Sequence, residues 1–199
     1  MHIALIGATG TIGTAVNRQL KDRGHTVSAL SRSTNPALSI EDHASIVNAL
    51  ESLEQIDAVA VASGSTPFKP LPELSRTDFA AALGNKALGQ IDIAQTAVSI
   101  LPEGGSITLI SGILANVPVT QGTTASVANA AIEAYVRSAA GLLPRGIRIN
   151  AISPSVLTES LDGYAPFFPG ISPVDADDVA AAYVRSIEGA ETGQVITVL

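Results

Sequence analysis

The chain has 199 residues, of which 46% are hydrophobic and only 4% aromatic, and its formal net charge is −7. This length suits one domain with a core of small aliphatic side chains, and the negative charge disfavours nucleic acid or an anionic membrane as a partner. The absence of cysteine excludes disulfides, thiolate metal sites and a cysteine nucleophile. No apolar stretch approaches the roughly 20 residues that span a bilayer, and the N-terminus lacks the features of a signal peptide, so we expect a cytoplasmic protein.

Short β-branched runs alternate with longer amphipathic stretches along the chain. Strands are predicted at His2–Gly7, His25–Leu30, Asp57–Ala62, Ser106–Ser111, Gly146–Ile152 and Gln194–Val198. Helices are predicted over Thr11–Arg23, from Ser39–Asp42 to about Leu53, from Ser75–Asp78 to about Leu101, over Thr123–Leu142 and over Asp175–Glu188, with Ser153–Ser172 as a loop. This alternation predicts one α/β domain over residues 1–199, with a Rossmann-type, doubly wound parallel sheet and helices on both faces.

A glycine-rich turn, Gly7-Ala8-Thr9-Gly10-Thr11-Ile12-Gly13, follows the first predicted strand and opens the first predicted helix. In this position Gly7 permits the tight turn, Gly10 lets the backbone approach a pyrophosphate, and Gly13 allows the helix to pack closely on the strand. The turn therefore predicts a dinucleotide-binding site. The alternative is a glycine-rich turn without a ligand.

The end of the second predicted strand indicates which dinucleotide is bound. An acidic residue there would favour a ribose 2′-hydroxyl, whereas a basic residue favours a 2′-phosphate. The sequence has Ser31-Arg32-Ser33, with no acid before Glu41. Arg32 can pair with the phosphate and the two serines can donate to it, which favours NADP(H). A solvated surface arginine is the alternative.

The chain resembles the short-chain dehydrogenase/reductase family over essentially its whole length. The resemblance rests on the glycine turn, on Ala62-Ser63-Gly64, on Leu109-Ile110-Ser111-Gly112 and on Arg148-Ile149-Asn150-Ala151-Ile152-Ser153-Pro154. It implies about seven strands, a cofactor over the carboxyl ends of the strands, a small-molecule substrate, and a homodimer or homotetramer. It also implies cofactor contacts from Thr9, Thr11, Ile12, Ala62, Ser63, Gly64, Lys86, Pro154 and Val156.

The family's catalytic pair, Tyr-x-x-x-Lys, has no counterpart at the matching positions. Aligning Ala130-Ala131-Ile132-Glu133 with the residues that follow the family's lysine places Asn129 at the lysine position and Ala125 at the tyrosine position. Ser111 fits the family's serine, which orients the substrate carbonyl. Lys86 takes the place of the family's asparagine in Lys86-Ala87-Leu88-Gly89.

Two residues are candidates to replace the missing acid. Lys86 could restore the positive charge and, if desolvated, transfer protons itself; the alternative is an exposed helix lysine. Tyr164, in a predicted lid over Val156–Ile171, could supply a phenol, although it could equally pack with Phe167 and Phe168. The three histidines are scattered along the chain and predict no metal site.

Two functional hypotheses follow. The first is an NADP(H)-dependent oxidoreductase with an atypical active site, in which Ser111 orients a small carbonyl or alcohol substrate and Lys86, Tyr164 or water supplies the proton. The second is a non-catalytic NADP(H)-binding sensor or scaffold, favoured by the absent pair. A protein that has lost cofactor binding altogether conflicts with the intact glycine turn.

Overall fold

The computed structural model describes residues 1–199 and is built around one parallel sheet of six strands. The strands are β1 (His2–Ile6), β2 (Thr26–Leu30), β3 (Ala58–Val61), β4 (Ser106–Ile110), β5 (Arg148–Pro154) and β6 (Val195–Val198). They lie in the order β2-β1-β3-β4-β5-β6, and every neighbouring pair is parallel. The predicted doubly wound Rossmann-type sheet is confirmed.

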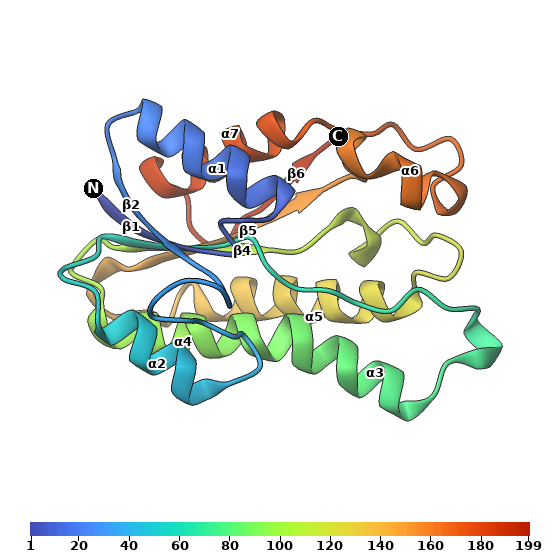
Figure 1. The fold of residues 1–199 in the computed structure, drawn as a ribbon, viewed down its shortest axis with the longest axis horizontal. Helices are drawn as coiled ribbons and strands as arrows, with labels where there is room; N and C mark the ends of the chain where they lie inside the picture. Colours follow the sequence, from blue (N-terminus) through green and yellow to red (C-terminus); the bar gives the residue numbers. More distant parts are fainter.

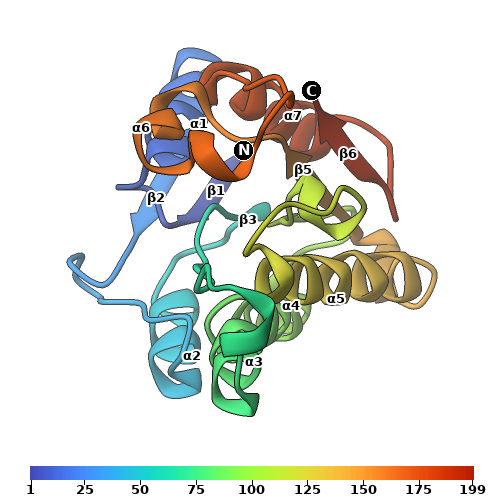
Figure 2. The same cartoon turned by 90° about the vertical axis from the view of Figure 1, so that its right-hand side faces the viewer.

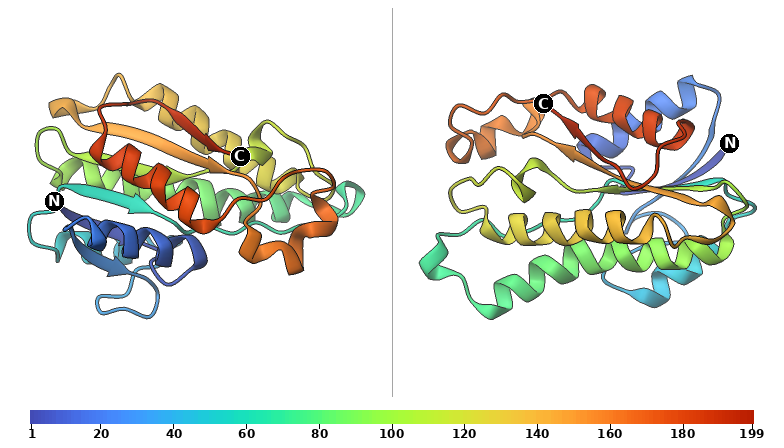
Figure 3. Two further views of the ribbon diagram at one scale, coloured as in Figure 1. Left: turned by 90° about the horizontal axis from the view of Figure 1, so that it is seen from above. Right: turned by 180° about the vertical axis from the view of Figure 1, so that it is seen from behind.

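Helices cover both faces of this sheet (Figure 1). One face carries α1 (Thr11–Asp22) and α7 (Ala176–Glu188), which lie side by side in the view from above (Figure 3). The other carries α2 (His43–Glu51), α3 (Arg76–Ala82), α4 (Gly89–Ile100) and α5 (Thr123–Ala139). The short helix α6 (Leu161–Tyr164) lies at the end of the molecule where the strands finish (Figure 2). No helix is long and apolar enough to cross a membrane.

Alternation of side chains along the strands divides the core in two. In β1, Ile3 and Leu5 join the cluster under α1 and α7, whereas Ala4 and Ile6 join the cluster on the opposite face. All residues of β3 and β4 are buried, as expected for strands covered on both faces. Tyr183 of α7 is completely buried and its hydroxyl donates to the carbonyl of Val61, so it is a core residue.

The sheet has six strands rather than the seven that the family resemblance implies. β2 is the edge strand, and only residues 31–42 separate it from α2. A parallel crossover connection, including its helix, needs a dozen or more residues, so this segment is too short to hold both a crossover and a further strand. The missing strand would have paired with the outer side of β2.

Several predicted boundaries were wrong by a few residues. The second helix begins at His43, because Asp42 is its N-cap and accepts from the amide of Ala44. The helix predicted to reach Leu142 ends at Ala139, and β5 extends to Pro154. The segment predicted as a loop from Ser153 also contains α6.

The capping box of Ser75 and Asp78 is confirmed, and the helix that it begins continues to Ile100 through a π-helical stretch, Leu83–Leu88. Just after this stretch, the buried carboxamide of Gln90 pairs with both backbone groups of Ile110 at the end of β4, at 2.8 and 2.9 Å. The pairing between β3 and β4 ends at Ala60 and Thr108, so the side chain of Gln90 supplies the hydrogen bonds beyond that point. A π-helical insertion of this kind often lies at a functional site.

Candidate active site

The glycine turn has the geometry of an anion-binding turn. Gly7 has a φ of 82°, a left-handed conformation that favours glycine, and a Cβ on Gly13 would lie only 2.0 Å from the carbonyl oxygen of Gly7. No side chain caps the start of α1, so the first amides of this helix have no partner within it and remain available to an anion. Gly13 is buried beneath the turn, whereas Thr11 is exposed.

A cavity of about 550 Å³ lies directly above this turn. Its lining includes Gly7, Thr9, Gly10, Ser31, Arg32, Ser33, Glu41 and Asn85. Arg32 is exposed and makes no ion pair or side-chain hydrogen bond within the chain, so its guanidinium is free to bind a ligand. Glu41 is distant from Arg32 in sequence, and the sequence reasoning did not place it in this site. The cavity therefore contains both a base and an acid.

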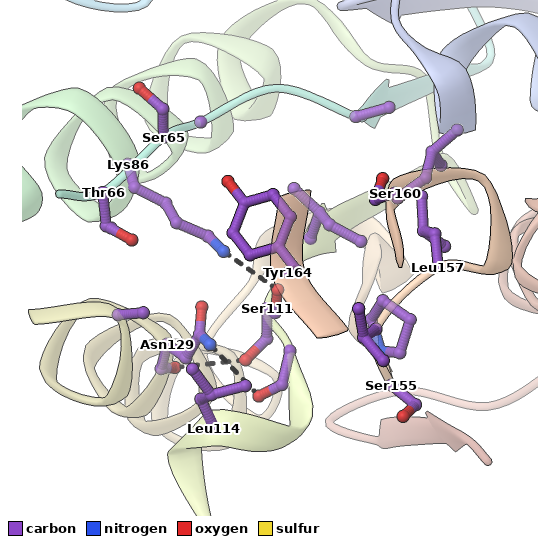
Figure 4. A pocket seen from close by; sticks show the side chains of 18 of the residues that line it. Ser65, Thr66, Lys86, Ser111, Leu114, Asn129, Ser155, Leu157, Ser160 and Tyr164 are labelled. Atoms are coloured by element: carbon purple, nitrogen blue, oxygen red, sulfur yellow. Dashed lines mark hydrogen bonds between the residues drawn. The ribbon is translucent and has the colours of Figure 1, made fainter. Parts of the chain in front are cut away.

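A second cavity, of about 310 Å³, continues from the first along the carboxyl ends of the strands. The two share Ala62, Ser63, Gly64 and Ser65, the residues that follow β3. The second is lined further by Ile12, Thr66, Phe68, Lys86, Ser111, Leu114, Ala125, Asn129, Pro154, Val156, Ser160, Tyr164 and Phe168 (Figure 4). Most of the site residues expected from the sequence line one cavity or the other; Thr11 and Gly13 line neither.

Lys86 reaches the second cavity from the π-helical stretch. Its stem passes close to Gly64, where a Cβ would lie 2.7 Å from Cγ of Lys86, so a side chain at position 64 would block the path. Its Nζ donates to the backbone carbonyl of Ser111 at 3.0 Å, and it has no ion-pair partner. Desolvation lowers the pKa of Lys86 from 10.5 to about 8. Lys86 is thus an uncompensated, half-buried cation rather than an exposed helix lysine.

Ser111 belongs to a buried polar network that reaches α5. Its hydroxyl donates to Oε1 of Glu133 at 2.9 Å and lies 3.3 Å from the carbonyl of Asn129. The carboxylate of Glu133 also accepts from Ser153 and Asn116 and lies 3.5 Å from Arg137. The single hydroxyl hydrogen of Ser111 is therefore engaged with Glu133. A substrate oxygen could accept it only after that hydrogen bond breaks.

Ala125 and Asn129 lie one helical turn apart on the face of α5 that lines the cavity. Nδ2 of Asn129 donates to the carbonyl of Gly112 at 3.2 Å, which fixes the orientation of the amide. Its Oδ1 is buried and has no partner. Figure 4 shows this oxygen on the cavity side, facing the end of Lys86. A buried acceptor without a donor is costly, so this atom indicates a ligand group that donates.

Tyr164 is part of an aromatic wall, which we define as Phe68, Tyr164 and Phe167. The ring of Phe68 lies 5.3 Å from that of Tyr164 and 5.2 Å from that of Phe167. The Tyr164 ring projects over the cavity (Figure 4), and its residue is 41% exposed. Tyr164 therefore packs against neighbouring aromatic rings, which was the alternative to a catalytic role. Because it also lines the cavity, its hydroxyl stays a candidate proton donor.

The sequence reasoning did not identify Glu133, Thr66 or Phe68 as site residues. The available signal for Glu133 was a carboxylate on the mostly apolar buried face of α5, where an unpaired charge is rarely found. Phe68 lies in a segment rich in proline, and nothing local indicates that it meets Tyr164 nearly a hundred residues later.

Comparisons with known proteins agree with this geometry. A family model described as enoyl-(acyl carrier protein) reductase matches residues 37–199. A hydroxynaphthalene reductase of Aspergillus fumigatus is 30% identical over 164 residues, and the match covers 77% of this chain and 60% of that reductase. The chain therefore spans less than two thirds of the length of that relative.

Solved structures match over the full chain. A protein from Listeria innocua superposes with a TM-score of 0.96 and is 40% identical, with 100% of both chains covered. A small-chain dehydrogenase in complex with NADPH has a TM-score of 0.88 and 30% identity, covering 100% of this chain and 96% of that one. Because this family model covers most of the sequence, the chain belongs to the short-chain dehydrogenase/reductase family.

Proposed function

We propose that the protein is an NADP(H)-dependent oxidoreductase that interconverts a small carbonyl compound and the corresponding alcohol with an atypical active site. The observation that carries the proposal is Lys86, a half-buried ammonium without a counterion in the cavity at the carboxyl ends of the strands. Holding such a charge in this position is unfavourable for stability, which supports a role in ligand binding or catalysis.

The first cavity fits the adenosine half of NADP(H). The free first-turn amides of α1 suit a pyrophosphate, and the unpaired guanidinium of Arg32 suits a 2′-phosphate. The related small-chain dehydrogenase that was solved with NADPH supports the same choice. Glu41 is the feature that would favour NAD(H) instead, since a carboxylate can accept from a ribose 2′-hydroxyl.

NADPH, when bound, supplies the hydride. Lys86 donates a hydrogen bond to the substrate oxygen and transfers a proton to it as negative charge develops there, for which a pKa of about 8 is well matched to neutral pH. The backbone carbonyl of Ser111 accepts a hydrogen bond from Lys86 and thereby orients it. The side-chain hydroxyl of Ser111 donates to Glu133. Tyr164 is the second candidate donor.

A titration of the purified protein with NADPH and with NADH, followed by cofactor fluorescence, tests the proposal. We expect NADPH to bind more tightly, and Arg32→Ala to weaken NADPH far more than NADH. Glu41→Gln is the matched control, because it removes the acid from the same cavity and should leave the preference for NADPH in place.

If Arg32→Ala lowered the affinities for NADPH and NADH equally, the 2′-phosphate assignment would be refuted. Tight NADPH binding without turnover of any carbonyl substrate would instead support the sensor or scaffold hypothesis.

We also propose a homodimer or homotetramer that associates through the long helices α4 and α5. Leu88, which ends the π-helical stretch just before α4, is 59% exposed, and Val127 of α5 is 38% exposed. Light scattering after size exclusion measures the mass, and a monomer at micromolar concentration would contradict this proposal.

A further inference from the structure

Two side chains at the base of the second cavity have complementary hydrogen-bonding capacity. Lys86 carries three N–H donors and uses one on the carbonyl of Ser111. Oδ1 of Asn129 can only accept, is buried and has no partner. Both residues line the same cavity and face one another across it (Figure 4). A ligand group placed between them must accept from one and donate to the other.

A hydroxyl group meets both requirements with a single oxygen. A ketone oxygen or an ether oxygen can accept from Lys86 but leaves Oδ1 of Asn129 without a donor. The cavity lining contains no Asp or Glu that would compete for the ammonium. The base of the cavity is therefore selective for the hydroxyl form of a ligand.

The same cavity is also lined by apolar side chains, three of which are aromatic. These include Phe68, Tyr164 and Phe168, together with Leu114 and Val156. Phe68 and Tyr164 already meet edge to face, and such rings prefer a further aromatic ring in an offset or edge-on arrangement. A flat ring therefore suits this wall better than a flexible chain.

From these contacts we infer that the site takes an alcohol that carries an aromatic ring next to its carbinol carbon, whose C–H supplies the hydride; the hydroxyl lies between Nζ of Lys86 and Oδ1 of Asn129, and the ring packs against Phe68 and Tyr164. This inference names the substrate class of the proposed reductase and rests on that function. The same pair of contacts holds the reduced, hydroxyl-bearing form of a substrate more tightly than its carbonyl form.

The probes are 2-naphthol and 2-methoxynaphthalene, two unreactive mimics of such an alcohol, since neither has a carbinol hydrogen to give as hydride. They have the same ring system and differ in whether the oxygen can donate. We measure their affinities by calorimetry, with and without saturating NADP⁺. We expect 2-naphthol to bind roughly tenfold more tightly, the effect of one buried hydrogen bond. Asn129→Ala and Lys86→Met should each bring the two affinities together.

Ser160→Ala is the matched control, because this residue lines the same cavity outside the pair and its side chain makes no hydrogen bond as the N-cap of α6. It should retain the preference. If Asn129→Ala does not fold, as judged by circular dichroism, Lys86→Met decides the outcome alone.

Equal affinity of the two probes for the unaltered protein would overturn the inference. The inference would also be overturned if the free protein preferred 2-naphthol and this preference disappeared with NADP⁺ bound. Lys86 and Asn129 would then be binding the cofactor. Failure of NADPH to bind would refute the proposed function, whereas the probe comparison in the cofactor-free protein would still be decided.

Discussion

Replacing Lys86 with methionine should stabilise the folded protein while it removes reductase activity. Methionine keeps an unbranched stem of similar length beside Gly64 but carries no charge into the cavity. The ammonium of Lys86 is desolvated in the folded state and has no carboxylate partner to compensate for this. The unfolded chain, by contrast, leaves the same ammonium in water.

The magnitude follows from the pKa. A fall from 10.5 to about 8 corresponds to about 3 kcal/mol at pH 7, because one pKa unit is about 1.36 kcal/mol. The variant also loses the hydrogen bond to the carbonyl of Ser111, which costs about 1 kcal/mol. We therefore expect a net gain of about 2 kcal/mol, or roughly 4–8 °C in Tm for a chain of this length.

The gain should depend on pH in a defined direction. Below pH 8 the wild-type lysine is charged in both states, so the full penalty is present. Between about pH 8 and 10.5 the folded protein releases this proton while the unfolded chain retains it, so wild-type stability rises through this window. The advantage of Lys86→Met should shrink accordingly.

Urea unfolding at pH 7 and pH 9.5, followed by circular dichroism, measures both quantities. Lys21→Met, at an exposed position in the last turn of α1, is the control and should change stability little at either pH. The reasoning would be refuted if Lys86→Met were no more stable than the wild type at pH 7. It would also be refuted if the difference in the free energy of unfolding were the same at both pH values.

Three further variants test other parts of the site. Gly13→Ala places a Cβ against Gly7 and should cost about 1–3 kcal/mol in thermal unfolding and weaken NADPH binding, whereas Gly84→Ala, with open space around it, should do neither. Glu133→Gln should lower kcat with little change in the Kd for NADPH, because the amide cannot accept from all of its present donors; an unchanged kcat would make the network structural only. Tyr164→Phe should keep kcat within about twofold, since the ring contacts persist, and a large fall would move proton donation from Lys86 to this phenol.

Local patterns predicted the fold well, because each strand and helix carries its own periodicity and caps. The glycine turn and the Ser75 capping box are instances in which a few adjacent residues determine the backbone. The sheet has six strands where the resemblance implies about seven, because that number came from the resemblance and not from any apolar run in residues 31–42. The sequence itself contains six such runs.

The candidate site was less predictable, because its chemistry depends on contacts between distant segments. Lys86 could be placed near Ser111 by alignment, but whether it was solvated depended on how its stem crosses Gly64. The missing partner of Oδ1 of Asn129 is likewise a property of the folded cavity, since any asparagine in a helix has the same atoms.

The carboxamide of Gln90 has a consequence for how this architecture can diversify. It meets Ile110 where the ladder between β3 and β4 has ended, so a replaceable side chain supports that end of the crevice. Backbone pairing fixes the strand register upstream, and a substitution at position 90 would leave those hydrogen bonds intact. A descendant of this chain could therefore reshape its binding crevice through one helical residue while the sheet beneath stays the same.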